Sequence, residues 1–193
     1  IEAAHPEVRC YRYWPELSSD CRLMTKLLRD LTDYSMSDQL TKQRSDLCNL
    51  LRRAYLSCLP LTEGTNKTLT YTSRVSCAYM PLDSPKMMEA LLNLIVNALD
   101  AISDNGSVQI ILTKSNEQFI VSITDDGCGI TPKQLLTIFH PFTTTKPDGT
   151  GLGLPVAKRI IEGHGGHIRV SSAPNQGATF TFLLPCVFSS DRK

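Results

Sequence analysis

One predicted helix, residues 84–102, limits the fold and the chemistry of this chain more than any other segment. Pro85 is typical of a first helical turn. The apolar positions of this segment fall on one helical face and must pack against a core. Glu89, Asn93 and Asn97 follow one another at intervals of four residues and therefore lie along another side. The segment thus predicts a helix that packs on one face and carries a polar site on another.

Asparagine is a poor helix former, so two of them in an otherwise apolar helix favour a compensating role. A neutral amide oxygen suits a Mg²⁺ ion that is already partly neutralised by phosphates, because this cation takes few protein ligands. Asn97 is therefore the candidate metal ligand. Asn93 and Glu89 are candidate catalytic residues, because they could hydrogen-bond phosphate, water or the incoming nucleophile. On the helix alone, asparagines that simply face water are an equal alternative.

A glycine-rich segment follows directly after a predicted strand, residues 119–124. Asp125 shares the parity of the apolar residues of that strand, so its side chain is expected to point to the core face. An inward carboxylate needs a donor, and the exocyclic amine of adenine would supply one. Gly127 and Gly129 would let the backbone approach a flat ring, and Ile130 completes this candidate nucleotide-binding segment. A tight turn with a solvated carboxylate is the alternative.

A second glycine-rich segment opens the predicted helix 150–164. Backbone N–H groups at a helix N-terminus attract phosphate, and glycines permit close approach. No Lys-Ser or Lys-Thr pair follows the last glycine, which excludes a Walker motif, and no strand directly precedes the segment, which disfavours a Rossmann site. The candidate nucleotide-binding residues here are Gly149, Thr150, Gly151, Leu152, Gly153 and Leu154.

The segment between the two glycine-rich stretches, residues 139–146, combines aromatic residues, a proline, hydroxyls and a lysine. It is predicted to form a mobile lid with a rigid base. Phe142, Thr144 and Thr145 are candidates for contacts with the nucleotide. Lys146 could reach the phosphates.

The other patterns along the chain indicate an α+β fold, a two-layer α/β sandwich preceded by a long bundle-forming helix. Further helices are predicted at 46–57 and 132–139, and further strands at 68–78, 108–113, 168–172 and 179–184. Apolar residues between Trp14 and Leu31 alternate in steps of three and four, which favours one strand of a helical bundle over a helix packed on its own domain. The expected divisions are 1–36 for the bundle helix, 37–43 for a linker, 44–187 for the main domain and 188–193 for a tail.

In chain order, the amide helix, the first glycine segment, the lid and the second glycine segment resemble the N, G1, F and G2 boxes of sensor histidine kinases, over about residues 40–185. Their superfamily of ATPases also includes gyrase, the Hsp90 chaperones and MutL. The resemblance implies that ATP and Mg²⁺ bind between a helix layer and the lid.

By the resemblance, Asp125 reads adenine, Asn97 holds Mg²⁺ and Asn93 assists near the γ-phosphate, while the second glycine segment cradles the phosphates. Thr179 would support the adenine pocket, although strand parity leaves this open. Asp126 departs from the family pattern, which has asparagine there, and would add negative charge near the nucleotide.

The N-terminal helix resembles the second helix of the dimerisation and phosphotransfer hairpin, which implies a homodimer. His5 is followed by Pro6, unlike the phosphoacceptor of the family, and a helical hairpin needs two full arms. We therefore expect the acceptor upstream of this chain, which starts at Ile1 and reads as a piece of a larger protein.

The resemblance implies transfer of the γ-phosphoryl group of ATP to a histidine and then to a response regulator. An ATP-gated chaperone or topoisomerase module, an anti-sigma-type serine kinase and an ATP-binding module without transfer activity are the alternatives. The net charge of +1 gives no reason to expect nucleic acid or membrane as partners. Seven cysteines without a CxxC pair indicate a reducing cytosol. We expect a cytoplasmic domain, which includes the case of the cytoplasmic part of a membrane-bound sensor.

Overall fold

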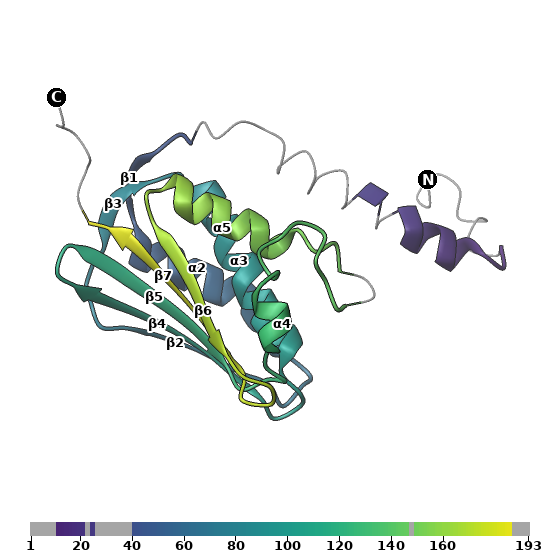
Figure 1. The fold of residues 1–193 in the computed structure, drawn as a ribbon. Coiled ribbons are helices and arrows are strands. Elements are labelled where there is room, and N and C mark those ends of the chain that lie inside the picture. Colours follow the sequence, from purple (N-terminus) through teal and green to yellow (C-terminus); the bar gives the residue numbers. More distant parts are fainter. Residues whose placement is uncertain (1–10, 22–23, 26–39, 147–148, 187–193) are drawn as a thin grey trace.

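The computed structural model describes residues 11–21, 24–25, 40–146 and 149–186. From residue 40 onwards, one layer is a five-stranded sheet and the other is made of helices (Figure 1). The elements are β1 Gln43–Asp46, α2 Leu47–Cys58, the 3-10 helix η2 Leu59–Thr62, β2 Thr68–Ser73, β3 Tyr79–Leu82, α3 Ser84–Ala101, β4 Ser107–Ser115, β5 Gln118–Asp125, α4 Pro132–Leu135, α5 Gly153–Gly163, β6 His167–Ser172 and β7 Ala178–Pro185. The predicted two-layer α/β sandwich is confirmed.

The sheet has the order β2-β4-β5-β7-β6, in which only the β2–β4 pair is parallel. Buried and less buried residues alternate along β5 and β7, as expected for strands with one face against a core. The core face of β4 and β5 carries Val108, Ile110, Val121 and Ile123, all fully buried. Helix α3 covers this face of the sheet with its apolar side (Figure 1). The polar side of the helix is therefore left for other contacts.

The strand predicted at 68–78 is wrong in its second half, because the chain turns after β2. The hydroxyl of Ser73 accepts from the backbone N–H of Val75 and donates to its carbonyl (3.3 and 2.7 Å), which closes this turn. A separate strand, β3, then pairs with β1 in an antiparallel two-stranded sheet. Because β1 begins at Gln43, the predicted boundary between residues 43 and 44 falls inside a strand.

The two helices predicted around the lid are shorter than expected. The helix predicted at 132–139 ends at Leu135, and the chain after it forms turns. The helix predicted at 150–164 begins at Gly153, because Gly151 has a φ of +67°, which a right-handed helix does not allow. The second glycine segment is therefore a loop that leads into α5.

Residues 14–21 are helical, and Leu17 and Met24 of the predicted seam are 55% and 63% exposed. Most of the predicted bundle helix, with Leu31 and His5, lies outside the described residues, so the bundle stays a prediction. Among the described residues, no helix has the length and apolar character needed to cross a membrane.

A buried histidine joins the ends of α3 and α5. His164 is 5% exposed; its Nε2 accepts from the backbone N–H of Asp83 (2.9 Å), and its Nδ1 lies 2.7 Å from the carbonyl oxygen of Ile160. The Asp83 carboxylate caps α3 through Lys86 N and accepts from Thr41 N (2.9 Å). His164 thus has a packing role where α3 begins and α5 ends.

The stability of the domain should fall in mild acid. Burial is the main cause that lowers the pKa of His164 from 6.5, and Lys42 adds to it, while the bond to Ile160 and the charge of Asp83 oppose it. The unfolded chain therefore binds the proton more tightly, so this contribution to stability is present above the unfolded pKa of about 6.5 and is lost as the pH falls from there toward the lower pKa of the folded state. We expect the Tm to fall by about 2–4 °C between pH 7.5 and 5.5. In His164→Gln, which cannot titrate, this part of the pH dependence should disappear.

Candidate functional site

Asp125, the last residue of β5, is buried and lies on the core face of the sheet, which confirms the parity argument. Its Oδ1 accepts from the backbone N–H groups of Gly127 (3.0 Å) and Ala178 (3.2 Å). Burial raises the pKa of this carboxyl, and the two hydrogen bonds partly oppose it. Both bonds go to Oδ1 and leave Oδ2 unused. Since no buried side-chain oxygen of the described residues lacks a hydrogen-bond partner, Oδ2 cannot be buried. Oδ2 is therefore accessible and can accept a hydrogen bond from a ligand.

The glycines of the first segment have a role that the sequence did not predict. A Cβ at Gly127 would overlap the carbonyl oxygen of Ala101 at the end of α3, and one at Gly129 would overlap that of Ala173 before β7. Their lack of a side chain serves close packing between backbone segments of the protein, and the predicted approach to a flat ring stays a prediction. This packing fixes the position of Asp125.

The turn between β6 and β7 supports the same segment from the other side. The backbone N–H of Ile130 donates to Oγ of Ser172 (2.8 Å), and this hydroxyl donates to the carbonyl of Gly177 (2.6 Å). Gly177 in turn donates its N–H to the carbonyl of Gly127 (3.0 Å). Ile130 thus belongs to the frame of the segment, and its backbone N–H is already used.

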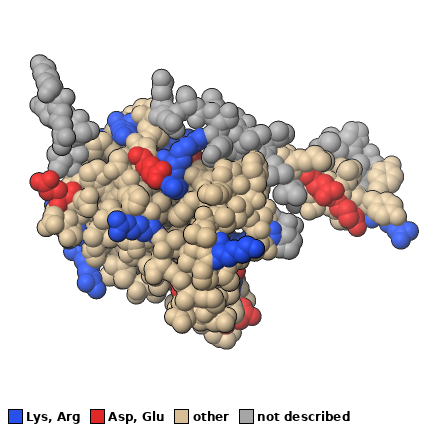
Figure 2. Space-filling view, in the orientation of Figure 1, with Lys and Arg blue, Asp and Glu red and all other residues tan. Residues whose placement is uncertain are grey.

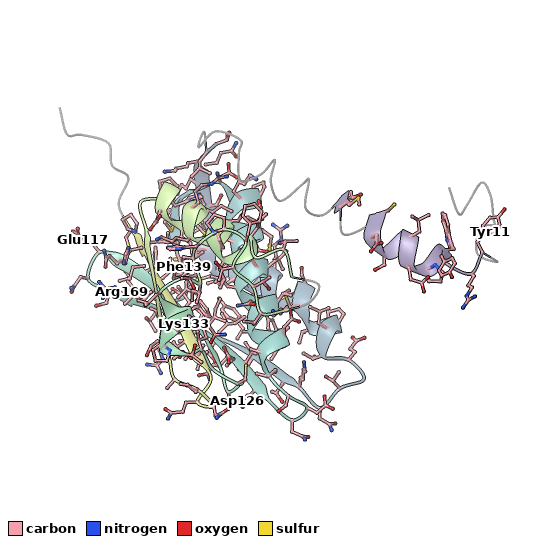
Figure 3. The ribbon with its side chains drawn as sticks, turned by 45° about the vertical axis from the view of Figure 1, so that its right-hand side comes forward. Tyr11, Glu117, Asp126, Lys133, Phe139 and Arg169 are labelled. Carbon is pink, nitrogen blue, oxygen red and sulfur yellow. The ribbon has the colours of Figure 1, made fainter. Side chains whose placement is uncertain are left out.

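Asp126, expected to bring negative charge to the nucleotide, is instead committed to the start of β4. It accepts from the backbone N–H (2.8 Å) and the hydroxyl (2.7 Å) of Ser107, and these bonds lower its pKa. In Figure 3, Asp126 lies at the lower end of the sheet, below Lys133 and Phe139. Both oxygens of this carboxylate are thus held by Ser107, and the group stays ionised.

The assignment of Thr179 to the adenine pocket is wrong. Thr179 pairs with Thr124 across β5 and β7, and their hydroxyls lie 3.1 Å apart. Asp125 and its partner Ala178 are one residue further along and point to the opposite face. The residue of β7 that contacts Asp125 is therefore Ala178, through its backbone.

The polar side of α3 meets the loop that leads into α5 and the lid. A Cβ at Gly153 would lie 3.4 Å from Oδ1 of Asn93, so this amide lies beside the N-terminus of α5. One turn further on, Oδ1 of Asn97 accepts from Nζ of Lys146 (2.9 Å). Glu89, proposed for catalysis, forms an ion pair with Lys86 on its own helix (3.0 Å). The structure thus brings Asn93 and Asn97 to the glycine loop and the lid, whereas the contact described for Glu89 stays on α3.

The described lid residues are tied to the second glycine segment by their backbone. The N–H of Phe142 donates to the carbonyl of Gly151 (3.0 Å), and Gly149 donates its N–H to the carbonyl of Lys146 (3.1 Å). The hydroxyl of Thr144 accepts from the N–H of Lys146 (3.0 Å). The side chain of Phe142 is 63% exposed and that of Thr145 is exposed, so both are available to a ligand.

The remaining candidates of the second glycine segment differ in what they can offer. Leu152 is fully buried and Leu154 packs against the core, so only their backbone could meet a phosphate. The hydroxyl of Thr150 accepts weakly from the N–H of Leu152 (3.4 Å). These contacts shape the loop that leads into α5.

Asp100 was missed by the sequence analysis, although it lies three residues after Asn97 and hence on a neighbouring position of the helix. Its Oδ2 accepts from Nζ of Lys146 (2.8 Å). Asn97 and Asp100 are hard oxygen donors of the kind that Mg²⁺ prefers, and both already contact one cationic group. Among the described residues no cluster of three or more His, Cys, Asp or Glu could hold a metal ion, so a magnesium ion here would depend on phosphate oxygens as well.

Charged side chains on the surface do not gather into a broad patch of one sign on the face shown in Figure 2. Blue and red side chains alternate there with uncharged surface.

Comparison with known proteins agrees with this geometry. Residues 82–187 match the family model described as histidine kinase-, DNA gyrase B- and HSP90-like ATPase. The chain is 33% identical over 172 residues to the sensor histidine kinase ZraS of Salmonella typhimurium. The matched residues make up 89% of this chain and 37% of that protein. The chain thus spans little more than a third of this relative.

Solved structures give the same result. The nucleotide-free catalytic domain of histidine kinase ThkA is similar with a TM-score of 0.68 and 30% identity, over 75% of this chain and 95% of that one. ThkA in complex with the response regulator TrrA shares the fold with a TM-score of 0.77 at 23% identity, over 92% of this chain and 52% of that chain. The chain therefore belongs to the family of histidine kinase-, DNA gyrase B- and HSP90-like ATPases, and carries a histidine-kinase ATPase domain.

Proposed function

We propose that this chain is the catalytic, ATP-binding part of a two-component sensor histidine kinase. The observation that carries the proposal is the series of contacts along α3. Near its end, Ala101 packs on the segment of Asp125; one turn earlier Asn97 meets Lys146 of the lid; one turn before that Asn93 faces Gly153. One helix thus collects an adenine acceptor, a metal ligand and a phosphate-binding loop in the order in which ATP presents base, metal and phosphates.

In the proposed reaction the residues position ATP and neutralise its charge. The Oδ2 of Asp125 accepts from the exocyclic amine of adenine, and Asn97 supplies an oxygen to Mg²⁺. Asn93 and the N-terminus of α5 lie along the phosphates, and Lys146 contacts them from the lid. A histidine nitrogen then forms the bond to the γ-phosphorus while the bond to the ADP oxygen breaks, and the phosphoryl group passes on to an aspartate.

The partners proposed for the chain follow from its relatives. Sensor histidine kinases are the proteins it resembles, and ThkA binds a response regulator, which supports a receiver domain as partner. The exposed apolar positions of the N-terminal helical segment support dimerisation through this helix. The acceptor histidine would lie outside this chain, and the domain would work in the cytoplasm.

Removing the Asn97 oxygen should weaken the magnesium-dependent part of nucleotide binding. In Asn97→Ala we expect the ratio of ATP Kd values without and with Mg²⁺ to fall about 10-fold, because one ligand of the ion is lost. Isothermal titration calorimetry of the whole chain measures this ratio. Asn49→Ala, which removes an exposed amide from α2, is the matched control and should change nothing. Equal magnesium dependence in Asn97→Ala and the unaltered chain would refute the assignment.

An ATP-gated chaperone or topoisomerase module is the second candidate class. The polar side of α3 carries Asn93 beside Gly153, and an amide cannot act as a base toward water as a carboxylate can. The only carboxylate predicted for catalysis, Glu89, is paired with Lys86. Steady ATP hydrolysis by the chain should therefore stay near the rate of a blank, and rapid turnover would favour this second class.

A further inference from the structure

Lys146 forms a contact to α3 that none of the roles above explains. Its Nζ lies 2.8 Å from Oδ2 of Asp100 and 2.9 Å from Oδ1 of Asn97. The Lys146 and Asp100 side chains are 41% and 51% exposed, so the pair is open to solvent. A single ammonium group from the lid thus bridges two neighbouring oxygens of the helix that the nucleotide would use.

The position of this ammonium conflicts with a magnesium ion. Mg²⁺ binds its oxygen ligands at about 2.0–2.1 Å, so an ion on Oδ1 of Asn97 would compete for the oxygen that Lys146 holds. Two cations on one amide oxygen repel each other strongly at such distances. Lys146 and the metal therefore exclude each other at Asn97.

The bridge also restrains the described part of the lid. The backbone of Lys146 forms two hydrogen bonds. Its N–H donates to Oγ1 of Thr144 (3.0 Å), and its carbonyl accepts from the N–H of Gly149 (3.1 Å). Anchoring of its side chain on α3 hence also restrains Thr144 and Gly149, which are bonded to its backbone.

We propose that Asp100 is a positioning residue that holds Lys146 on the metal ligand Asn97 in the nucleotide-free domain, and that Mg²⁺ arriving with a nucleotide displaces this lysine toward the phosphates. This rests on the proposed binding of ATP and Mg²⁺ at α3. The ammonium serves as a placeholder for the ion, and its release couples metal binding to the position of the lid. The carboxylate of Asp100 would then remain next to Asn97 on α3 without its lysine partner.

The first test uses the chain without nucleotide and so does not depend on ATP binding. Amide hydrogen exchange is measured for residues 142–146 and 149–153 in Asp100→Asn, Lys146→Met and the double variant. Each single variant should raise the exchange rate of these amides about 3- to 10-fold, and the double variant should exchange no faster than either. Glu162→Gln, which breaks the similarly exposed Lys158–Glu162 pair on α5, is the matched control and should leave these amides unchanged. Unchanged exchange in Asp100→Asn, or effects that multiply in the double variant, would overturn the proposal.

The second test addresses competition with the metal by following the side chain of Lys146 by NMR as ADP is added without and with Mg²⁺. ADP alone should leave the contact of Lys146 with Asn97 and Asp100 in place, whereas ADP with Mg²⁺ should shift the Lys146 signal. A Lys146 signal that does not respond to Mg²⁺ would show that lysine and metal do not exclude each other. If the unaltered chain bound no ADP at all, the proposed function would fail, whereas the exchange experiment would still report on the bridge.

Discussion

Asp125→Asn should weaken binding of ATP or ADP about 100-fold. The Oδ1 position is held by two backbone N–H groups, so an asparagine keeps its oxygen there and turns its NH₂ group to the place of Oδ2. A donor would then face the donor amine of adenine. Loss of a hydrogen bond to a charged acceptor, together with the unpaired donors, costs about 3 kcal/mol, which corresponds to roughly 100-fold in Kd. Calorimetric titration of the whole chain with ADP measures the change.

The neighbouring carboxylate provides the control for this experiment. Asp126→Asn alters the same charge one residue away, but its side chain binds Ser107 and an asparagine oxygen can still accept from that backbone N–H. We expect the affinity for ADP to change by no more than about 2-fold. Equal losses in both variants would indicate that the charge of the segment, rather than the Oδ2 atom of Asp125, determines binding.

Gly177→Ala should lower the Tm by about 10 °C. Gly177 has a φ of +69°, a conformation that costs a residue with a Cβ about 1–2 kcal/mol. Its Cβ would also overlap the backbone carbonyl of Asp125, and strands cannot shift far enough to relieve this without losing the bond between Asp125 and Ala178. The total cost is about 4 kcal/mol, and 1 kcal/mol corresponds to about 2–4 °C for a chain of this length. Thermal unfolding followed by circular dichroism gives the shift.

Gly64→Ala separates the two causes. Gly64 has a similar φ of +73°, but a Cβ there would meet no atom within 4 Å. This variant should therefore show only the conformational cost, a decrease in Tm of about 2–8 °C. If both variants lost the same stability, the close contact between Gly177 and Asp125 would have no energetic role.

The sequence predicted the parts of this molecule that depend on local periodicity. The spacing of Glu89, Asn93 and Asn97 and the parity of Asp125 follow from the geometry of one helix and one strand, and their placement agrees with the structure. Resemblance of the ordered motifs added the ATPase fold, which the family match confirms.

Contacts between distant segments were beyond such reasoning. Whether Thr179 or Ala178 faces Asp125 depends on the register of β5 against β7, which no local pattern reveals. The four-residue strands β1 and β3 are too short to show alternation, so the linker boundary was misplaced. In the sequence, nothing distinguishes Asp100 from other exposed acidic residues. Only the fold of the lid brings Lys146 into contact with it.

A crystal structure of the chain with Mg²⁺ and a non-hydrolysable ATP analogue tests the central claim most directly. We expect the exocyclic amine of adenine within hydrogen-bond distance of Oδ2 of Asp125, Mg²⁺ on Oδ1 of Asn97, and the phosphates beside Asn93 and the start of α5. A nucleotide bound elsewhere, or with its adenine away from Asp125, would contradict the account.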